Sequence, residues 1–417
     1  MTDFTRPEAA PAPDKTATIA PAAARTMPLP EFIALMAAIS AVTALSIDAM
    51  LPAFPSMAAD LGLVNENRIQ LVLATFAWGM GVGTIFSGPI TDWLGRKRAI
   101  TWGFGLYVLA SIGCALAPSL EWLLVGRFVM GLGASAPRIA GVALIRDLYA
   151  GREMARIVSF VMMVFMIVPA MAPIMGEWIM SVADWRGIFH AYVLFGLAAA
   201  LWLNLRQPET LPPERRRPLT LRSIVAGTRE VLSERQIVLC AIAMTLGFGQ
   251  MFSMLMSSKQ LFTETYGQGE NFTKWFALMA VLGACGTFAN ARLVMRVGMR
   301  RIVNWTFGMQ ALSSVVLLAL IFGGALPDAA QFPVFFVWAA GLMGVAGLTF
   351  GNLNAIAMQY KGNIAGTTAS VISAISTFFG AIIAAAAGQS FNGTVVPLAL
   401  ASMLCSGLAL VITLRLK

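Results

Sequence analysis

The sequence predicts an all-α membrane protein with twelve transmembrane helices in two six-helix bundles related by a pseudo-two-fold axis. Only 12% of the 417 residues are charged and 58% are apolar, whereas about a quarter of the residues in an ordinary soluble domain are charged. Twelve apolar stretches are long enough, at about 20 residues each, to cross roughly 30 Å of hydrocarbon. We therefore expect the lipid bilayer to surround this chain.

The expected spans follow one another at short intervals. They cover residues 33–54, 69–91, 100–118, 122–145, 157–182, 188–205, 236–257, 272–293, 302–324, 332–357, 364–387 and 396–414. The longest polar interval after the first span separates six spans from six. The expected domains are a disordered cytoplasmic tail rich in Ala, Pro and charge, an N-terminal bundle, a central cytoplasmic linker and a C-terminal bundle, at 1–30, 31–205, 206–235 and 236–417.

The distribution of basic residues predicts the orientation of the chain. Most Lys and Arg fall on one side of the membrane or at the helix ends on that side. The exceptions are Arg127 and Arg138, inside spans, and Arg68, Arg186, Lys259 and Lys274, on the other side. Because cytoplasmic loops carry an excess of Lys and Arg, we expect both termini in the cytoplasm. Topology thus accounts for the net charge of +9, and nucleic acid is not an expected partner.

The sequence carries no motif of a membrane enzyme or of an ATP-driven pump. It contains no phosphate-binding loop, catalytic triad or carboxylate pair at hydrolase spacing. The one His and the four Cys lack metal-ligand spacing, and each Cys falls in an apolar stretch, so neither a metal site nor a disulfide framework is expected. We expect no enzymatic activity and no cofactor, and a gradient as the energy source.

A repeated segment predicts that the two halves are related. Residues 95–105 (GRKRAITWGFG) match residues 298–308 (GMRRIVNWTFG) at one constant offset, and both copies follow the second span of their half. Basic turns recur in any membrane protein, but the shared Gly, Trp, Phe and Gly favour duplication. Transporters are built from such repeats around a site near the membrane midplane.

Several motifs resemble those of a known family. Residues 88–98 (GPITDWLGRKR), 127–133 (RFVMGLG) and 169–176 (PAMAPIMG) look like the loop signature, the fourth-helix motif and the fifth-helix antiporter motif of the major facilitator superfamily. Residues 46–55, 146–149, 185–189 and 209–216 are similar to the bicyclomycin/chloramphenicol-resistance (Bcr/CflA) drug efflux family. The resemblance covers nearly the whole chain after residue 30. It implies twelve helices and export of small hydrophobic antibiotics in exchange for protons at the bacterial inner membrane.

Ionisable groups inside spans are candidate functional groups, because each costs about 2.5–3.5 kcal/mol on insertion scales. Asp48 in the first span and Arg127 in the fourth both lie roughly 8–9 Å below the expected outer surface. The two can pair, and a proton arriving on Asp48 would release Arg127; a static ion pair joining two helices is the alternative. The resemblance also carries a proton-coupling Asp onto Asp48 and a functional Arg onto Arg127.

Two further charges depart from the family pattern. Glu177 stands where the fifth-helix motif normally has Gly; it is either a second proton site in the Asp48 layer or an interfacial carboxylate. Arg138 follows Arg127 by eleven residues, about three helical turns, so both point to one face of the fourth helix. Arg138 either meets an anionic or polar substrate in a cavity or pairs with another polar group of the protein.

Asp92, Arg96 and Asp147 form a predicted charge cluster on the cytoplasmic side. Asp92 and Arg96 are about one helical turn apart, and Asp147 ends the fourth span. The resemblance implies that this cluster, together with Gly88 and Gly95, forms a latch. The latch would hold the outward-facing state and break when the inner side opens. Positive-inside topology alone is the alternative, although topology does not require Asp92.

Candidate substrate contacts come from two kinds of side chain. Met and Phe adapt to varied apolar ligands, although lipid-facing helices contain them too, and polar groups in the later spans are less costly when they face a cavity. The candidates are Arg138, Met162, Phe165, Met166, Gln250, Met251, Asn352 and Asn354.

The sequence favours a monomeric, proton-coupled exporter of small amphipathic or hydrophobic compounds that works by alternating access. One alternative is a transporter of the same fold for a single metabolite, which Arg138 and Lys259 would allow to be acidic. A second is a non-transporting sensor or scaffold, which gives no reason for an Asp and an Arg matched in depth. The expected partners are a small molecule, protons and the bilayer.

Overall fold

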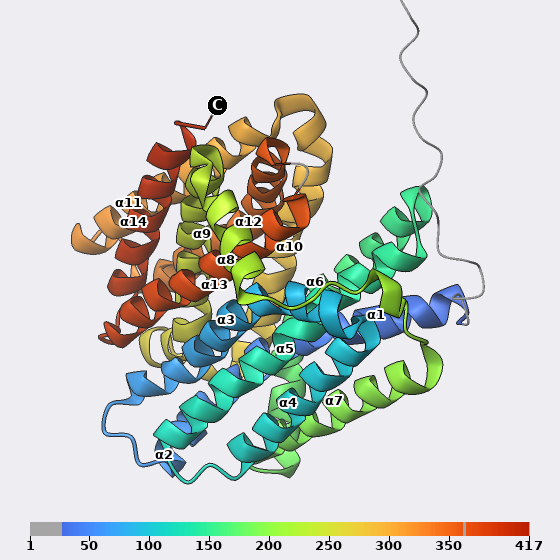
Figure 1. Ribbon diagram of the computed structural model, residues 1–417. Helices are drawn as coiled ribbons and strands as arrows, with labels where there is room; N and C mark the ends of the chain where they lie inside the picture. The colour runs from blue at the N-terminus through green and yellow to red at the C-terminus, as the bar shows by residue number, and fades with distance from the viewer. Residues whose placement is uncertain (1–26, 362–363, 417) are drawn as a thin grey trace, which may run out of the picture.

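The computed structural model describes residues 27–361 and 364–416 and is helical throughout its regular elements (Figure 1). The helices of the first half are α1 (Leu29–Asp48), α2 (Phe54–Asp60), α3 (Leu71–Leu94), α4 (Arg96–Ala115), α5 (Leu120–Leu148), α6 (Gly151–Val182) and α7 (Arg186–Arg206). Helix α8 (Leu221–Ser233) lies in the linker. Those of the second half are α9 (Arg235–Gln260), α10 (Phe272–Val297), α11 (Met299–Phe322), α12 (Asp328–Tyr360), α13 (Ala365–Gln389) and α14 (Val396–Thr413).

Within the described residues, twelve helical segments are long and apolar enough to cross a membrane, which confirms the predicted number. The first of them joins α1 and α2 through a short turn, Leu51–Ala53, and runs from Leu29 to Asp60. The predicted tail falls outside the described residues, except for its last four, where α1 begins.

The twelve spans form two bundles with equivalent internal packing. In the first bundle α3 packs on α5 and α4 on α7; in the second, α10 packs on α12 and α11 on α14. The bundles meet along two seams, α3 against α13 and α6 against α10. Exchange of the halves turns one seam into the other, so the interface has the pseudo-two-fold symmetry that the repeated segment predicts.

The repeated turn has the same backbone conformation in both halves. Gly95 ends α3 and precedes α4 with φ +101°, and Gly298 ends α10 and precedes α11 with φ +87°. Residues with a Cβ rarely adopt such positive φ angles. The two glycines therefore produce the same sharp turn at equivalent places.

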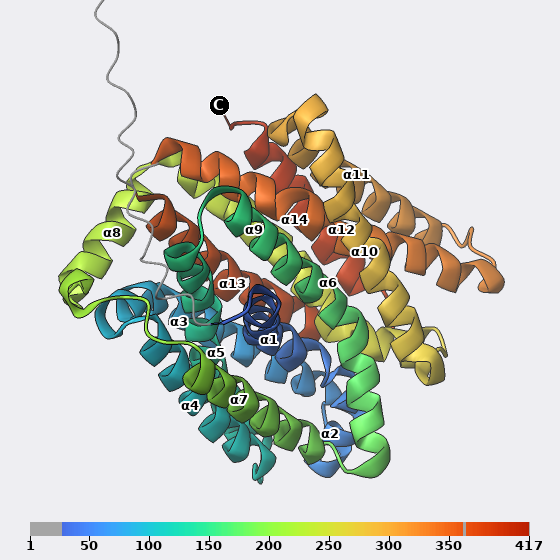
Figure 2. The same ribbon diagram turned by 90° about the vertical axis from the view of Figure 1, so that its right-hand side faces the viewer.

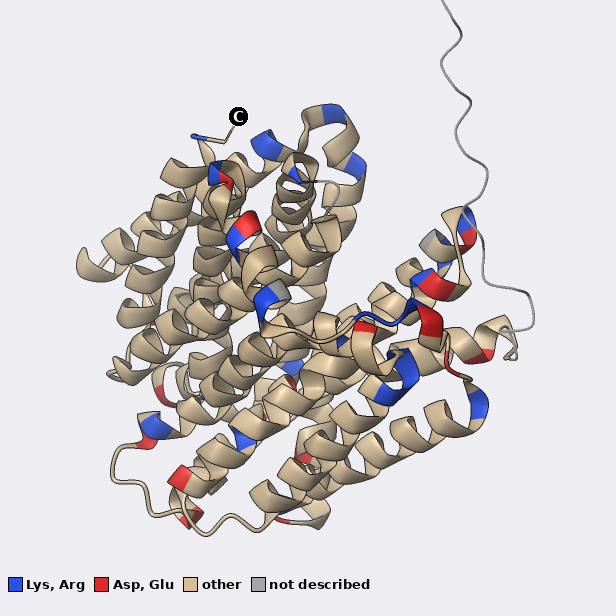
Figure 3. Ribbon diagram, in the orientation of Figure 1, with Lys and Arg blue, Asp and Glu red and all other residues tan. Residues whose placement is uncertain are grey.

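The two ends of the molecule differ in their charge and in the contacts between the two bundles. We call the ends that carry the linker the linker side, and the opposite ends, where α1 finishes and α3 begins, the far side. Lys and Arg gather mainly on the linker side and along the linker (Figure 3). On the far side, the Gln389 amide donates to the main-chain oxygen of Asn67 at 2.7 Å, and Gln70 donates to Gln260. The bundles are therefore tied together on the far side.

Helices α6 and α10 show that the bundles touch on the far side and separate toward the linker side. Their far ends are joined by a hydrogen bond of 2.6 Å from the Thr273 hydroxyl to Glu177. Both helices then diverge toward the linker side (Figures 1 and 2). The protein is thus closed on the far side and spread on the linker side.

Candidate functional site

A buried polar layer surrounds the end of α1. The helix stops at Asp48, and Pro52, four residues later, has no N–H to continue the hydrogen-bond pattern. The last carbonyls of a helix need other donors; here a side chain supplies one for Ser46, and another adds to the Ala49 N–H that already binds the Leu45 oxygen. The Arg127 guanidinium donates to the Ser46 oxygen at 2.8 Å, and the Tyr192 hydroxyl donates to the Leu45 oxygen at 3.0 Å.

Arg127 is held entirely by neutral groups of the first bundle. It is fully buried, its Nε donates to the Val72 oxygen at 3.1 Å, and its guanidinium carbon lies 4.4 Å from the centre of the Phe76 ring. A cation at the negative end of a helix is stabilised by the helix dipole. Arg127 therefore caps α1 and joins α5 to α1 and α3.

Asp48 lies in the same layer but does not pair with Arg127 in this conformation. Its side chain is buried, with 4% of the residue exposed, and its Oδ1 has no hydrogen-bond partner among the described residues. The predicted match in depth is present, since Arg127 binds the carbonyl two residues before Asp48. The expected ion pair is not formed, because main-chain oxygens already occupy the guanidinium.

The rest of the layer is tightly packed. The hydroxyls of Ser46 and Tyr107 lie 2.7 Å apart, joining α1 to α4. On the other side of α1, Gly176 of α6 approaches the carbonyl oxygen of Ala49 so closely that a Cβ would overlap it. The glycine of the fifth-helix motif is thus required by the contact between α6 and the turn that follows Asp48.

Glu177 follows Gly176 but faces the seam between the bundles. It is exposed and accepts the hydrogen bond from Thr273 of α10. The structure therefore places Glu177 at the contact between α6 and α10, on the far side of the Asp48 layer. Its role, as a second proton site or an interfacial carboxylate, stays a prediction.

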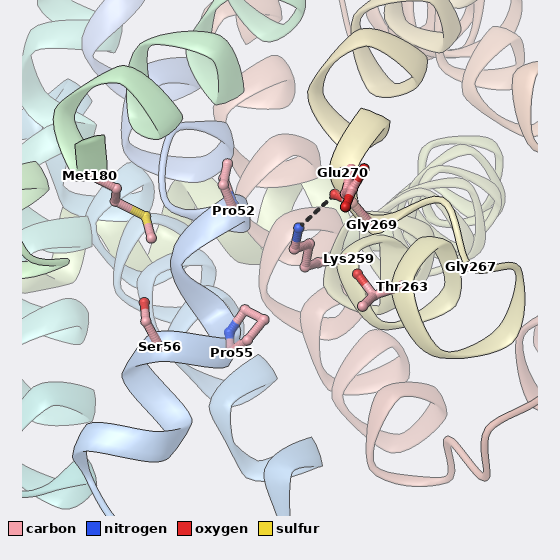
Figure 4. A pocket seen from close by; sticks show the side chains of 9 residues that line it. All are labelled: Pro52, Pro55, Ser56, Met180, Lys259, Thr263, Gly267, Gly269 and Glu270. Carbon is pink, nitrogen blue, oxygen red and sulfur yellow. Dashed lines mark hydrogen bonds between the residues drawn. The ribbon is translucent and has the colours of Figure 1, made fainter.

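A pocket of about 550 Å³ opens on the far side (Figure 4). Both halves line it: Pro52, Pro55, Ser56 and Met180 from the first, and Lys259, Thr263, Gly267, Gly269 and Glu270 from the second. The Lys259 ammonium donates to the main-chain oxygen of Gly269 at 3.2 Å. Pro52 follows Asp48 by four residues, so this pocket lies just beyond the buried layer along the chain.

Arg138 crosses from one bundle to the other. Its Nη2 donates to the Thr84 hydroxyl of α3 at 3.2 Å and to the Ser373 hydroxyl of α13 at 3.1 Å. Its Nε is buried without a partner in the part of the chain that the structure describes. The protein thus supplies polar partners for one nitrogen and leaves a second donor free at the seam.

Gln250 does not line a cavity in this conformation, and the prediction that it does is wrong here. It is fully buried in the second bundle, where its oxygen accepts hydrogen bonds from Ser402 at 3.1 Å and Ser406 at 2.8 Å. The two hydroxyls of α14 hold the amide in the bundle interior. The network continues from Ser402 to Gln310 and Ser314 of α11 and to Trp338 of α12.

The sequence contained a signal for this network. Gln310 is related to Tyr107 by the same offset that relates Gly95 to Gly298. Tyr107 binds Ser46 in the buried polar layer of the first bundle, which contains Asp48 and Arg127. Gln310 binds Ser402 in the second bundle, in a network of neutral side chains. The repeat thus identifies equivalent polar positions, one set with charges and one without.

The remaining predicted cavity residues fall into two groups. Asn352 is buried, and its amide donates to Asn290 of α10 at 2.7 Å, so it joins two helices of one bundle and its predicted lining role is wrong in this conformation. Asn354 is half-buried, and its oxygen has no partner among the described residues. Met162 is exposed, and Phe165, Met166 and Met251 are half-buried, so these and Asn354 stay predictions.

The predicted charge cluster is formed. Arg96 contacts Asp92 at 2.6 Å and Asp147 at 2.8 Å, and only 5% of Arg96 is exposed. The linker adds Glu209, whose carboxylate accepts from the Arg96 amide at 2.8 Å and fills the space where Gly95 lacks a Cβ. Sequence reasoning noted the Glu209 motif but gave it no role. Gly88 has open space around it, and no contact explains it.

The cluster differs from the expected latch. All its members belong to the first bundle or to the linker attached to it: Asp92 ends α3, Arg96 begins α4 and Asp147 ends α5. Rocking of one bundle against the other leaves these charges together. The cluster is accordingly intact while the bundles are spread on the linker side.

The protein thus has two equivalent six-helix bundles whose seams exchange under a two-fold rotation. This is the architecture of membrane transporters built from repeats. The chain belongs to the Major Facilitator Superfamily, whose family model matches residues 36–387. Members of this superfamily transport small molecules and are not enzymes.

Relatives agree with this assignment. The chain is 28% identical to a bicyclomycin resistance protein homolog of Haemophilus influenzae over 88% of this chain and 91% of the relative. It is 32% identical to the multidrug resistance protein MdtL of Escherichia coli over 40% and 42%. These names support the resemblance to the Bcr/CflA group.

Solved structures show the same fold. A D-xylose-proton symporter matches with a TM-score of 0.73 at 14% identity, over 92% of this chain and 97% of the other. The human organic anion transporter MFSD10 matches with a TM-score of 0.68 at 17% identity, over 94% and 100%.

Proposed function

We propose that this protein exports small amphipathic or hydrophobic compounds in exchange for protons. The observation that carries the proposal is the Asp48 carboxyl, buried inside a span with Oδ1 unpartnered within the described chain. An ionised carboxylate in such surroundings is costly, and a bound proton removes that cost. The relatives named for bicyclomycin and multidrug resistance support the substrate class.

The coupling depends on a choice between two partners for Arg127. In the conformation that is closed on the far side, Arg127 binds the end of α1 and Asp48 carries a proton, which it releases to the linker side when a compound binds. When the bundles rock and the far side opens, the turn between Asp48 and Pro52 becomes accessible from the pocket that Pro52 lines. Asp48, ionised until then and stabilised by Arg127, takes a proton from the far side and carries it back when that side closes, so each state of the carboxyl favours one conformation.

The orientation follows from the basic linker side. We place that side and both termini in the cytoplasm of a bacterial cell, with the chain in the inner membrane. The domains are then a tail at 1–30, bundles at 31–205 and 236–417, and a linker at 206–235, in a chain that works as a monomer. The structure corresponds to the inward-facing state in this orientation.

Drug accumulation in cells tests the proposal. In a host that lacks its own efflux pumps, expression of the protein lowers accumulation of a hydrophobic antibiotic, and a protonophore abolishes the difference. The control is Arg127→Ala, which removes the side chain that caps α1. Unchanged accumulation across a broad panel of drugs would reject export of drugs.

Arg138 supports a second candidate, transport of one acidic metabolite. Its Nε has no partner among the described residues and it lies at the seam between the bundles, where a carboxylate would meet a fixed cation. In this case a single organic acid stabilises the purified protein against heat and Arg138→Gln abolishes that effect. Thermal stabilisation by drugs, unchanged in Arg138→Gln, would exclude it.

A further inference from the structure

Helix α8 of the linker has one face against the protein. Val231 is fully buried, and Gly227 lies against the side chain of Thr367 in the first turn of α13. The Glu230 carboxylate lies 3.7 Å from the Lys361 ammonium. These contacts fix the helix against the linker side of the second bundle.

A second face of α8 is apolar and exposed. Leu221, Val225 and Leu232 are exposed by 69%, 57% and 41%. At about 100° per residue these three positions fall within one narrow stripe. The stripe runs beside the protein-facing residues along the length of the helix, where nothing in the described chain covers it.

Arginines border this stripe on the side away from the protein. Arg222 and Arg229 are both exposed, and neither forms an ion pair within the described residues. Along this side of the helix a hollow of about 480 Å³ is lined by Arg222, Val225, Ala226, Arg229, Glu230 and Ser233. Two unpaired cations therefore flank an open hollow next to an apolar stripe.

The position of α8 places this surface at the level of the membrane interface. After α8 ends at Ser233, the membrane span α9 begins at Arg235, and α8 packs on the first turn of α13 and on α3. Figure 2 shows α8 at the edge of the molecule. A helix with an apolar face bordered by Arg is typical of segments that lie in the interface plane.

We propose that α8 lies in the headgroup layer of the bilayer and binds anionic phospholipids. Leu221, Val225 and Leu232 contact the first methylenes of the acyl chains, and Arg222 and Arg229 bind headgroup phosphates. Charge complementarity selects anionic lipid over a zwitterionic one. This surface anchors the linker beside the second bundle, and it does not depend on which compound is transported.

Spin-label accessibility in lipid nanodiscs tests this surface with the full chain. The background variant is Cys285→Ser, because Cys285 is the exposed cysteine while Cys114, Cys240 and Cys405 are buried. A nitroxide at Val225→Cys should collide more with oxygen, which partitions into lipid, than with a water-soluble nickel complex. A nitroxide at Ser233→Cys, turned roughly 80° around the helix, should show the reverse preference.

The lipid dependence tests the arginines. In nanodiscs with phosphatidylglycerol, the Val225 label should be about tenfold more accessible to oxygen than to nickel, and Arg222→Gln with Arg229→Gln should remove most of that preference. The matched control Arg296→Gln with Arg301→Gln, on α10 and α11, should leave it unchanged. Equal accessibility to nickel at Val225 and Ser233, no effect of lipid charge, or shielding from both reagents by a protein segment would each overturn the proposal.

Discussion

At the residue scale, the distinguishing feature is an arginine bound to carbonyls beside a carboxyl whose Oδ1 has no hydrogen-bond partner among the described residues. Sequence spacing predicted that Asp48 and Arg127 share a depth, and they do. It did not predict how Arg127 is satisfied, because the Ser46 carbonyl becomes available only where the chain turns after Asp48. Every residue carries a main-chain carbonyl, so the residue types do not show which carbonyls are free to accept a hydrogen bond at a helix end.

Removal of the Arg127 cation should destabilise the first bundle. Arg127→Leu leaves the Ser46 oxygen at the end of α1 without its donor, and an unsatisfied buried group costs about 1–3 kcal/mol. Arg127→Lys should recover only part of this, since one ammonium lacks the planar fork that reaches the oxygens of Ser46 and Val72. The midpoint of thermal unfolding in detergent should decrease from wild type to Arg127→Lys to Arg127→Leu. Equal stability of all three variants would show that Arg127 does not cap α1.

At the element scale, the contact between α6 and the end of α1 depends on one missing side chain. Gly176→Ala places a Cβ against the carbonyl oxygen of Ala49, so α6 must move away from the turn that holds Asp48. We expect a loss of stability of about 1–3 kcal/mol and at least a tenfold loss of transport.

Gly88→Ala is the matched control for this contact, because Gly88 belongs to the segment that resembles the loop signature of the superfamily but has open space around it. Unfolding midpoint and transport should both stay close to wild type. If Gly176→Ala and Gly88→Ala behave alike, the close contact between α6 and Ala49 does not explain the need for glycine at position 176.

The charge cluster of α3, α4 and α5 should act on stability rather than on the choice of conformation. Arg96→Met leaves the mostly buried Asp147 carboxylate without its partner, which costs about 3–5 kcal/mol for a buried pair; Asp92→Asn should cost less, because Asp92 is half exposed. Chemical denaturation measures both. A latch between conformations would instead change the accessibility of labels on the far side in Arg96→Met, with little loss of stability.

At the scale of the whole molecule, closure of the far side should control turnover. Asn67 and Gln389 are hydrogen-bonded across the α3 and α13 seam. In the Cys285→Ser background, Asn67→Cys with Gln389→Cys should lose at least nine-tenths of its transport on oxidation and regain it on reduction, while each single variant stays active. Full transport by the oxidised double variant would show that this seam does not open.

The fold could be predicted from the sequence because its signals are strong and additive. Twelve long apolar stretches, one charged face and the repeat at Gly95 and Gly298 point to the same architecture. The site was predicted less completely. A polar residue in a span faces a cavity, as expected for Gln250 and Asn352, or another helix of its own bundle, as the structure shows. Spacing along one helix does not distinguish the two, since the partners Ser406 and Asn290 lie on other helices.

Proton-driven flux in proteoliposomes tests the central claim most directly. With an imposed pH gradient, the wild-type protein and the control Asp328→Asn, an exposed carboxylate at the start of α12, should move a hydrophobic drug against its concentration gradient. Asp48→Asn should lose that uphill transport by at least a factor of ten, and its residual downhill flux should not vary with pH. Uphill, pH-dependent transport by Asp48→Asn at the wild-type rate would contradict the account.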